Sequence, residues 1–368
     1  MAETGGTRQD LVTPPTGTLA ARVHPDAGFL FARRRGGWRN GRAMSLTVWT
    51  NYEFRPAARE VFLAGLAAAG CTLIQSARST CSVLTPGGPD PDLARADIAY
   101  GQPDPDDAMR QPRLKWIAVS TAGYTRYDRD DFRADMRARG TLVTSASQVF
   151  ANPCAEHLLA QMLALTRELP KYVLNQAGPR AWNYTAGRYT IDTLTGKTVL
   201  ILGYGAIGKR LAELLAPFRA RIIAVRRTPR GDEGVETVAE TELPRVLPLA
   251  DHVVNTLPDS PATRGRCGAA LFAAMKRGAF FYNIGRGTTV NQDDLGAALK
   301  SGRVGGAYLD ALDPEPLPPG HPLWTAPNCH LTPHLGGGHR TQDESLAGHF
   351  LENLRRFQRG EPLVDRIM

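Results

Sequence analysis

Three histidines, His330, His334 and His339, fall within ten positions of the segment NCHLTPHLGGGHR. Histidines this close together are typical of zinc sites or of acid and base catalysis. A zinc pair spaced like His330 and His334 needs a helix, because a spacing of four places both rings on one face. Pro333 and the glycines at 336–338 exclude a helix there. The pattern instead predicts no metal, and a strand end followed by a flexible turn, where one histidine at a cleft can transfer a proton.

A glycine-rich turn stands in the segment GKTVLILGYGAIGKRLAELLAPFRARIIAVRR. Its GxGxxG motif follows an apolar strand, Thr198 to Leu202, and precedes a helix and a second strand, Arg221 to Val225. This arrangement is typical of a dinucleotide-binding unit, in which the helix N-terminus offers its amides to the phosphates. The residues that we predict to contact the cofactor here are Gly203, Tyr204, Gly205, Ala206, Ile207 and Gly208.

The end of the second strand has an unusual charge for such a unit. An acidic residue normally stands there, about 20 residues after the glycines, and binds the adenosine ribose. This chain has Arg226 followed by Arg227, with Arg230 close behind. A guanidinium can pair with a 2′-phosphate through two hydrogen bonds. We therefore predict that Arg226 and Arg227 contact the cofactor and that NADP(H) is preferred, with NAD(H) as the alternative.

The net charge of +8 is concentrated near the N-terminus. Residues 1–44 contain seven arginines and three acidic residues, which gives +4. This segment has no apolar periodicity, so we predict a disordered basic extension. RRRGGWRNGR could contact nucleic acid phosphates, but a solvated extension is the simpler interpretation, and we predict no nucleic-acid partner.

The remaining composition is that of an ordinary globular protein, with 42% hydrophobic and 22% charged residues in 368. Neither a run of 18 apolar residues nor a secretory signal segment is present, which predicts a cytoplasmic protein without a membrane partner. The five cysteines lack the spacing of a disulfide framework or a metal knuckle. We predict that they are free thiols.

Short apolar strands alternate with helical patterns from Leu46 onward. This alternation predicts a parallel sheet flanked by helices. A long helix, residues 152–173, is expected to lead the chain out of this first unit.

The order of these segments resembles the D-isomer-specific 2-hydroxyacid dehydrogenases, the family of glyoxylate/hydroxypyruvate reductases and phosphoglycerate dehydrogenases. The resemblance covers roughly residues 110–365. It depends on LTGKTVLILGYGAIGKRLA, NTLPDSPATRG, YNIGRGTTVNQDDLGAALKSGRVGGAYLDALDPEPLP and HPLWTAPNCHLTPHLGG.

The resemblance implies an α/β protein with two Rossmann-like or flavodoxin-like domains, each built on a parallel sheet. The NAD(P)-binding domain, residues 149–330, would be inserted into a discontinuous substrate domain formed by residues 46–148 and 331–368. The active site would lie in the cleft between them, and closure would exclude water. The resemblance also suggests a homodimer.

The resemblance implies that His334 is the general acid and base, that Glu315 partners its ring, and that Arg286 binds the substrate. Reduction of a 2-oxo acid needs a proton on the carbonyl oxygen, which an imidazolium supplies and a neighbouring carboxylate favours. A planar guanidinium binds the substrate anion and polarises its carbonyl. Further family positions are Ala122 and Gly123 for the substrate, and Cys154, Leu257, Pro258, Thr263, Asn283, Ile284 and Asp310 for the cofactor.

The predicted function is therefore an NAD(P)-dependent oxidoreductase that interconverts a small 2-oxo acid and the D-2-hydroxy acid. One alternative is a dinucleotide-sensing corepressor on the same fold, against which the retention of Arg286, Glu315 and His334 speaks. The other is a formate-type dehydrogenase, in which the family places glutamine where this chain has Glu315.

Overall fold

The structure, a computed structural model, describes residues 45–79 and 87–368. The chain divides into two units, Met1–Ala43 and Met44–Met368, and every feature below belongs to the second. The predicted basic extension and Cys81 lie outside the described residues. No helix of the described part is long and apolar enough to cross a membrane.

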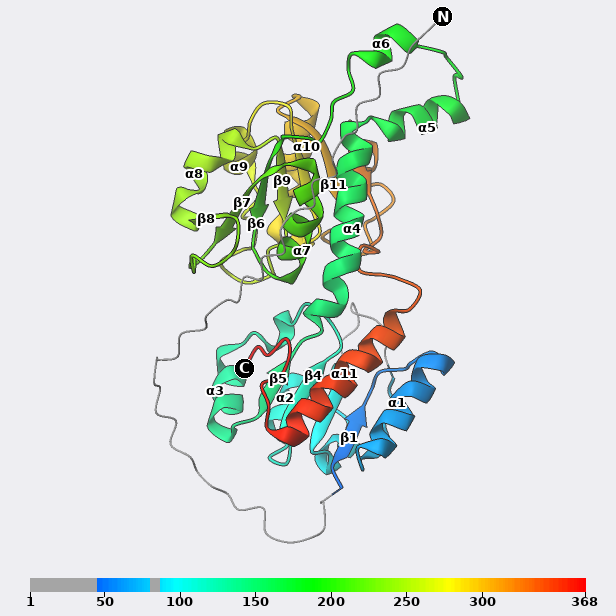
Figure 1. The fold of residues 1–368 in the computed structure, drawn as a ribbon, viewed down its shortest axis with the longest axis vertical. Coiled ribbons are helices and arrows are strands. Elements are labelled where there is room, and N and C mark those ends of the chain that lie inside the picture. Colours follow the sequence, from blue (N-terminus) through cyan, green and yellow to red (C-terminus); the bar gives the residue numbers. More distant parts are fainter. Residues whose placement is uncertain (1–44, 80–86) are drawn as a thin grey trace, which may run out of the picture. The chain divides into compact units, whose positions relative to one another are not determined.

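The first part of this unit contains a five-stranded parallel sheet in the order β2-β1-β3-β4-β5 (Figure 1). Its strands are β1 (Thr47–Thr50), β2 (Thr72–Gln75), β3 (Ile98–Gly101), β4 (Trp116–Val119) and β5 (Leu142–Thr144). The helices between them are α1 (Pro56–Ala68), α2 (Pro105–Met109) and α3 (Asp130–Arg139). This strand order is the flavodoxin-like one, and it places the loops after β1, β3 and β4 at one edge of the sheet.

The helices of this part begin and end where their sequences predict. Pro56 opens α1, and Ala58, Phe62 and Leu66 repeat every four residues and are buried. Gly140 closes α3 in the left-handed conformation, with a φ of 69°. Local sequence and tertiary packing therefore agree along this part of the chain.

The C-terminal helix α11 (Gln342–Arg359) shares the core of the first sheet. Phe350 lies against Trp116, with ring centroids 5.1 Å apart in a stacked arrangement. Beyond the helix, Arg366 forms an antiparallel bridge with Thr144 of β5. The last residues of the chain thus pack with its first strands.

The second part contains a seven-stranded parallel sheet in the order β12-β11-β10-β9-β6-β7-β8. Its strands are β6 (Thr198–Leu202), β7 (Arg221–Arg226), β8 (Glu236–Ala239), β9 (His252–Asn255), β10 (Ala279–Asn283), β11 (Val304–Leu309) and β12 (Cys329–Leu331). Its helices are α7 (Ala206–Leu215), α8 (Leu243–Val246), α9 (Ala269–Ala274) and α10 (Gln292–Lys300). The order reverses between β6 and β9, the place where dinucleotides bind in such sheets. Two wholly parallel sheets with intervening helices confirm the predicted α/β class.

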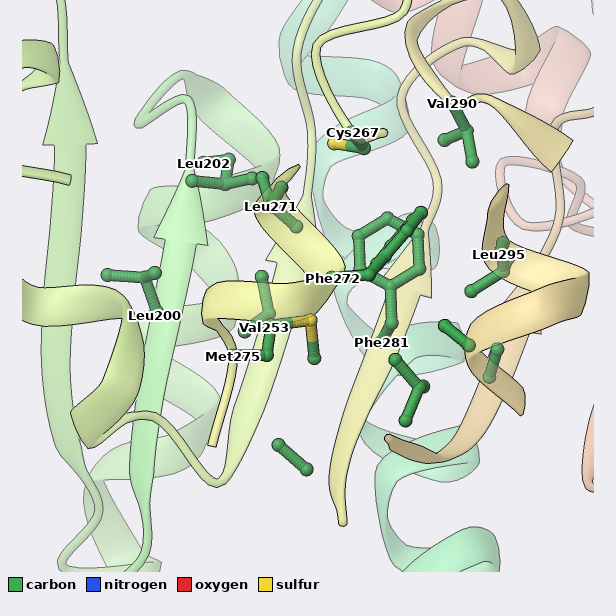
Figure 2. Packing of buried hydrophobic residues seen from close by; sticks show 14 of the residues in the cluster. Leu200, Leu202, Val253, Cys267, Leu271, Phe272, Met275, Phe281, Val290 and Leu295 are labelled. Atoms are coloured by element: carbon green, nitrogen blue, oxygen red, sulfur yellow. The ribbon is translucent and has the colours of Figure 1, made fainter. Parts of the chain in front are cut away.

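Apolar side chains fill the space between this sheet and the helices on one of its faces. Figure 2 shows Phe272 of α9 over Phe281 of β10, and their ring centroids lie 5.2 Å apart at 88°. Leu200 and Val253 of the central strands are fully buried in the same cluster. This packing holds the carboxyl ends of the central strands in a fixed register.

The helix that we expected over residues 152–173 has different bounds. The helix α4 runs from Ser147 to Thr166, and α5 (Leu169–Ala177) is separate from it. Glu168 has a φ of 51°, and Pro170 follows it, so the chain cannot continue as one helix. After α5, the short helix α6 (Tyr184–Arg188) leads toward β6, and both helices extend away from the seven-stranded sheet (Figure 1).

Candidate active site

The turn after β6 has the geometry of a phosphate-binding loop. Gly203 has a φ of 86°, which favours glycine, and a Cβ at Gly208 would lie 2.9 Å from the carbonyl oxygen of Gly203. Ala206 begins α7, whose first amides have no side-chain cap. The buried ring of Tyr204 packs in the core beside this turn. The glycine backbone and the free amides therefore fit a pyrophosphate.

Next to this turn lies a cavity of about 590 Å³. Of the predicted cofactor residues, those in its wall are Gly203, Tyr204, Gly205, Arg226, Arg227, Leu257, Pro258 and Thr263. The hydroxyl of Thr256 donates to the carbonyl of Gly203 at 2.7 Å and so joins the segment after β9 to the glycine turn. The cavity has the position of the adenosine half of a dinucleotide in this type of sheet.

Four arginines line the same cavity: Arg226, Arg227, Arg230 and Arg266. Arg226 is paired, since its Nη1 lies 3.0 Å from Oε1 of Glu233. Nη2 of Arg266 lies 3.5 Å from Oε1 of Glu240. Within the described residues, the side chains of Arg227 and Arg230 have neither a hydrogen bond nor an ion pair, and both are exposed. The sequence predicted the basic character of this wall but not the partner of Arg226.

At the other end of the site, His334 and Glu315 form a hydrogen-bonded pair. Nδ1 of His334 lies 2.9 Å from Oε2 and 3.2 Å from Oε1 of Glu315. Burial opposes ionisation of the carboxyl group, but hydrogen bonds from His334 and the backbone of Leu312 hold the pKa of Glu315 below its ordinary value of 4.5. An ionised carboxylate can only accept, so Nδ1 carries a proton. Nε2 is then the ring atom that can exchange a proton with a substrate.

Arg286 lies in the loop after β10, close to this pair. Burial lowers the pKa of its guanidinium, while the charge of Glu315 acts in the opposite direction, and the group stays cationic. A Cβ on Gly123 would lie only 1.6 Å from Nη2 of Arg286. The loop after β4, with Ala122 and Gly123, is therefore in direct contact with the guanidinium. The structure brings together residues that are far apart in the sequence and that were predicted to bind the substrate.

Asp310 is buried and holds the backbone that carries His334. Its carboxylate accepts hydrogen bonds from the N–H groups of Leu335, at 2.8 Å, and Gly336, at 2.9 Å. Its own carbonyl oxygen accepts from the N–H of His334 at 3.0 Å. Thr332 adds a hydroxyl donor at 2.6 Å. Four hydrogen bonds thus fix the turn, and in this structure Asp310 positions the histidine loop.

Sequence reasoning missed the residues that extend this network. The hydroxyl of Tyr308 lies within hydrogen-bond distance of Thr332 and 2.5 Å from Nε2 of His157 in α4. The available signal was the spacing of Tyr308 and Asp310, because residues two apart point to the same side of a strand. Thr332 stands two positions before His334 and offered a similar signal. The helix α4 is therefore connected to the histidine loop through a chain of polar side chains.

Side-chain hydrogen bonds join the segments at the ends of β9 and β10. The side-chain amide of Asn255 donates to Asn283 at 2.9 Å and to Thr289 at 2.7 Å. The amide of Asn283 donates to the carbonyl of Ala311 at 2.8 Å. The side chain of Asn283 is fully buried and occupied in this way, so the backbone is the part of that segment available to a cofactor.

The other predicted residues lie as follows. A Cβ on Gly337 would lie 3.6 Å from the sulfur of Cys154, which places this thiol beside the histidine loop. Burial raises the pKa of Cys154 to about 12, so the thiol is neutral at physiological pH. Ile284 also contacts this loop, because a Cβ on Gly336 would lie 2.7 Å from its Cδ1.

His330 lies in β12, apart from the pair of His334 and Glu315. Among the described residues, no group of His, Cys, Asp and Glu could hold a metal. Four of the five cysteines lie in the described part, and all four are free.

Comparison with known proteins identifies relatives of this chain. Residues 159–336 match the model of the D-isomer specific 2-hydroxyacid dehydrogenase, NAD binding domain. A human glyoxylate reductase/hydroxypyruvate reductase is 36% identical over 261 residues, which are 69% of this chain and 77% of that protein.

Two solved structures are also similar. A D-isomer specific 2-hydroxyacid dehydrogenase from Xanthobacter autotrophicus, in complex with NADPH and MES, is 29% identical with a TM-score of 0.71, over 88% of this chain and 98% of that chain. An NADPH-dependent glyoxylate/hydroxypyruvate reductase from Sinorhizobium meliloti, in complex with NADP and sulfate, is 29% identical with a TM-score of 0.69, over the same shares of the two chains.

The chain belongs to the D-isomer specific 2-hydroxyacid dehydrogenase family. It is thus an oxidoreductase that acts on the CH–OH group of 2-hydroxy acids and uses a nicotinamide dinucleotide.

Proposed function

We propose that the protein reduces a small 2-oxo acid of the glyoxylate and hydroxypyruvate class, with His334, Glu315 and Arg286 as its catalytic residues. The observation that carries this proposal is the pairing of Nδ1 of His334 with Glu315 next to a half-buried guanidinium. Relatives named glyoxylate reductase/hydroxypyruvate reductase support the substrate class.

The chain's own groups account for the polar part of this reaction. Arg286, against the loop of Gly123, binds the carboxylate and carbonyl oxygens of the substrate through charge-assisted hydrogen bonds. His334 donates a proton from Nε2 to the carbonyl oxygen as negative charge develops there. Glu315 stabilises the charged imidazole and holds its orientation through Nδ1. In the oxidative direction, the same nitrogen accepts the proton of the hydroxyl group.

The cofactor site is formed by the glycine turn, the first amides of α7 and the adjoining cavity. The close approach of Gly208 to Gly203 leaves room for backbone alone, and this is the cradle that a pyrophosphate needs. When bound, the nicotinamide dinucleotide supplies the hydride. Ile284 and Cys154 contact the histidine loop and would place apolar surface beside the nicotinamide, which helps to exclude water.

We further propose a preference for NADP(H) over NAD(H). The support is the cavity wall, where Arg227 and Arg230 are cations without a partner among the described residues. A guanidinium pairs well with a phosphate and gains less from a ribose hydroxyl. The NADPH and NADP in the structural relatives are consistent with this preference.

The proposed domains follow the two sheets. We propose that residues 46–148 and 331–368 form the substrate domain and that residues 149–330 form the dinucleotide domain. The shared core of α11 and the first sheet supports this division.

We also propose a homodimer in which α5 and α6 contact a second copy of this chain. This segment exposes several large apolar side chains, with Trp182 94%, Tyr189 81% and Leu174 69% exposed. Exposed apolar side chains that are gathered on one segment are typical of a protein–protein interface. Sedimentation equilibrium at micromolar concentration would show a dimer, and a monomer for the variant Trp182→Ser combined with Leu174→Ser. A monomeric wild type would contradict the proposal.

The activity is tested by NADPH oxidation with glyoxylate, hydroxypyruvate and pyruvate, beside NADP reduction with formate. We expect turnover with one or more of the 2-oxo acids and none with formate. Parallel assays with NADH give the cofactor preference as a ratio of kcat/KM values. Oxidation of NADPH with none of the three acids would contradict the proposed substrate class.

A further inference from the structure

The loop between β7 and β8 contains a buried carboxylate, Glu233. Its side chain is only 1% exposed. It accepts hydrogen bonds from the backbone N–H groups of Arg230 and Gly231, each at 2.8 Å, and from Nη1 of Arg226 at 3.0 Å. The bond from the backbone of Arg230 is the main cause that holds the pKa of Glu233 below its ordinary value. An anion that belongs to the chain itself therefore occupies the donors inside this loop.

These contacts fix the course of the loop. Gly231 and Gly234 have φ values of 84° and 75°, so the chain turns sharply on both sides of Glu233. The carboxylate connects the start of the turn to Arg226, the last residue of β7. The loop is thereby closed by its own side chain, and the residues between Arg226 and Glu233 are held along the cavity.

The same contacts determine which arginines of the cavity have a charge that no carboxylate of the described residues neutralises. The charge of Arg226, whose side chain is 20% exposed, is neutralised by Glu233. Arg227 and Arg230 belong to the loop that Glu233 closes, and both line the cavity. Neither side chain has a partner within the described part of the chain. A phosphate that entered this cavity would find these two cations uncompensated, whereas Arg226 would have to leave its carboxylate to reach it.

We propose that Glu233 is a specificity-determining residue for the cofactor. It neutralises Arg226 and braces the loop so that Arg227 and Arg230 receive the 2′-phosphate. Arg226, at the position where an acidic residue would mark an NAD enzyme, then acts on the phosphate through Glu233 and does not contact it. This inference rests on the proposed NADP(H) preference and names the residues that would produce it.

The decisive variant is Glu233→Gln, which removes the charge and keeps the size of the side chain. Binding is measured by the fluorescence of NADPH and NADH, and by competition with 2′,5′-ADP and 5′-AMP. We expect the Kd of NADPH and of 2′,5′-ADP to rise about tenfold, because a charge-assisted brace is lost. The Kd of NADH and 5′-AMP should not change, since the ribose hydroxyls do not depend on these cations.

A double-mutant cycle tests whether Arg226 and Glu233 act together. The double variant should weaken NADPH binding no further than Glu233→Gln alone, because the contact between the two residues is already broken in that single variant. The matched control is Glu236→Gln in β8. Glu236 also pairs with an arginine, Arg221, at 2.8 Å, but neither residue lines the cavity, so NADPH binding should stay at the wild-type value.

Three results would overturn the inference. Tighter NADPH binding in Glu233→Gln would show that the carboxylate merely competes with the phosphate for Arg226. Equal weakening of NADPH and NADH would show that the residue supports the whole adenosine site without selecting between cofactors. An unchanged Kd for NADPH would show that the brace has no role in binding. Equal affinity of the wild type for NADPH and NADH would instead contradict the proposed cofactor preference itself.

Discussion

The catalytic end and the adenosine end of this site use charged side chains in opposite ways. Around His334, hydrogen bonds hold the proposed proton-transfer groups in place: Glu315 is held by His334 and a backbone amide, and the loop of His334 is held by Asp310. Around the cavity, Arg227 and Arg230 are exposed and unpaired within the described residues. Proton transfer needs a fixed geometry, whereas binding a phosphate needs mainly available charge. The two ends should therefore respond differently to substitution and to salt.

The largest effect is expected from loss of the proposed general acid. His334→Ala should lower kcat by ~10² to 10⁴, because that is the usual contribution of such a group. Fluorescence titration should show that NADPH still binds. Because residue 334 has a φ of 54°, His334→Asn is a second variant, since asparagine tolerates this conformation. His339→Ala, in the same segment, is the matched control and should behave like the wild type. Wild-type kcat in His334→Asn would contradict the mechanism.

The second effect concerns the contact between Gly123 and Arg286. Gly123→Ala places a methyl group where Nη2 of Arg286 lies, so the guanidinium must move away from the substrate. Loss of its charge-assisted hydrogen bonds, about 1.5–3 kcal/mol, should raise KM for the 2-oxo acid about 10- to 100-fold. Gly296→Ala, where a Cβ meets nothing within 4 Å, is the control. An unchanged KM would show that this guanidinium is not the substrate anchor.

At the adenosine end, Arg227→Ala should lower the ratio of kcat/KM for NADPH over NADH about tenfold at low salt. Because the arginine is exposed, added salt should reduce the preference of the wild type, with screening on a length of about 10 Å at 0.1 M. The KM effect of Gly123→Ala should depend less on salt, because Arg286 is half-buried whereas Arg227 is exposed. Arg221→Ala is the control outside the cavity. A kcat/KM ratio of NADPH over NADH that does not change with salt would contradict the role of surface charge.

The pH profile of reduction should change in Glu315→Gln. The pKa of Glu315 lies below 4.5, so the wild-type carboxylate is ionised across the neutral range and favours the charged imidazole. Glutamine lacks this charge, and the alkaline limb of kcat should therefore move to lower pH. The two proteins should therefore differ most on the alkaline side of the profile. Superimposable profiles would show that the pair in the structure does not govern the proton.

The smallest effect is expected from Tyr308→Phe, which removes the hydroxyl between His157 and Thr332. We expect kcat to fall about 2- to 10-fold, as for one lost hydrogen bond, with NADPH affinity unchanged. Tyr282→Phe is a close match as a control, because Tyr282 is equally buried and its hydroxyl pairs with His252 in the core at 3.0 Å. Equal losses in both variants would indicate a general effect on stability.

The fold could be predicted largely from local sequence. The strand at Thr198–Leu202 and the turn of Gly203 follow from apolar residues next to a glycine motif, and both lie at the predicted positions. The expected helix of residues 152–173 had wrong bounds. Pro170 was a visible signal for its end, and the start at Ser147 depends on packing that no local pattern reveals.

The site was less accessible from sequence. Residues such as His334 and Glu315 were identified by family resemblance, and their spacing alone could not show that the side chains meet. Arg226 was correctly placed at the end of its strand, but its partner Glu233 lies seven positions later, across a loop whose path depends on the carboxylate itself. Charge type was therefore predictable here, while charge pairing was not.

The backbone of His334 has a consequence for how this protein can change over generations. A residue other than glycine at a φ of 54° costs on the order of 1 kcal/mol, which glycine would avoid. Selection for thermal stability alone would therefore favour glycine or asparagine at this position, and it would remove the proposed general acid. The proposed role of His334 in proton transfer would account for a histidine at this position. If His334 acts as proposed, copies of this gene that are released from selection for turnover should lose the imidazole early, while the fold around it persists.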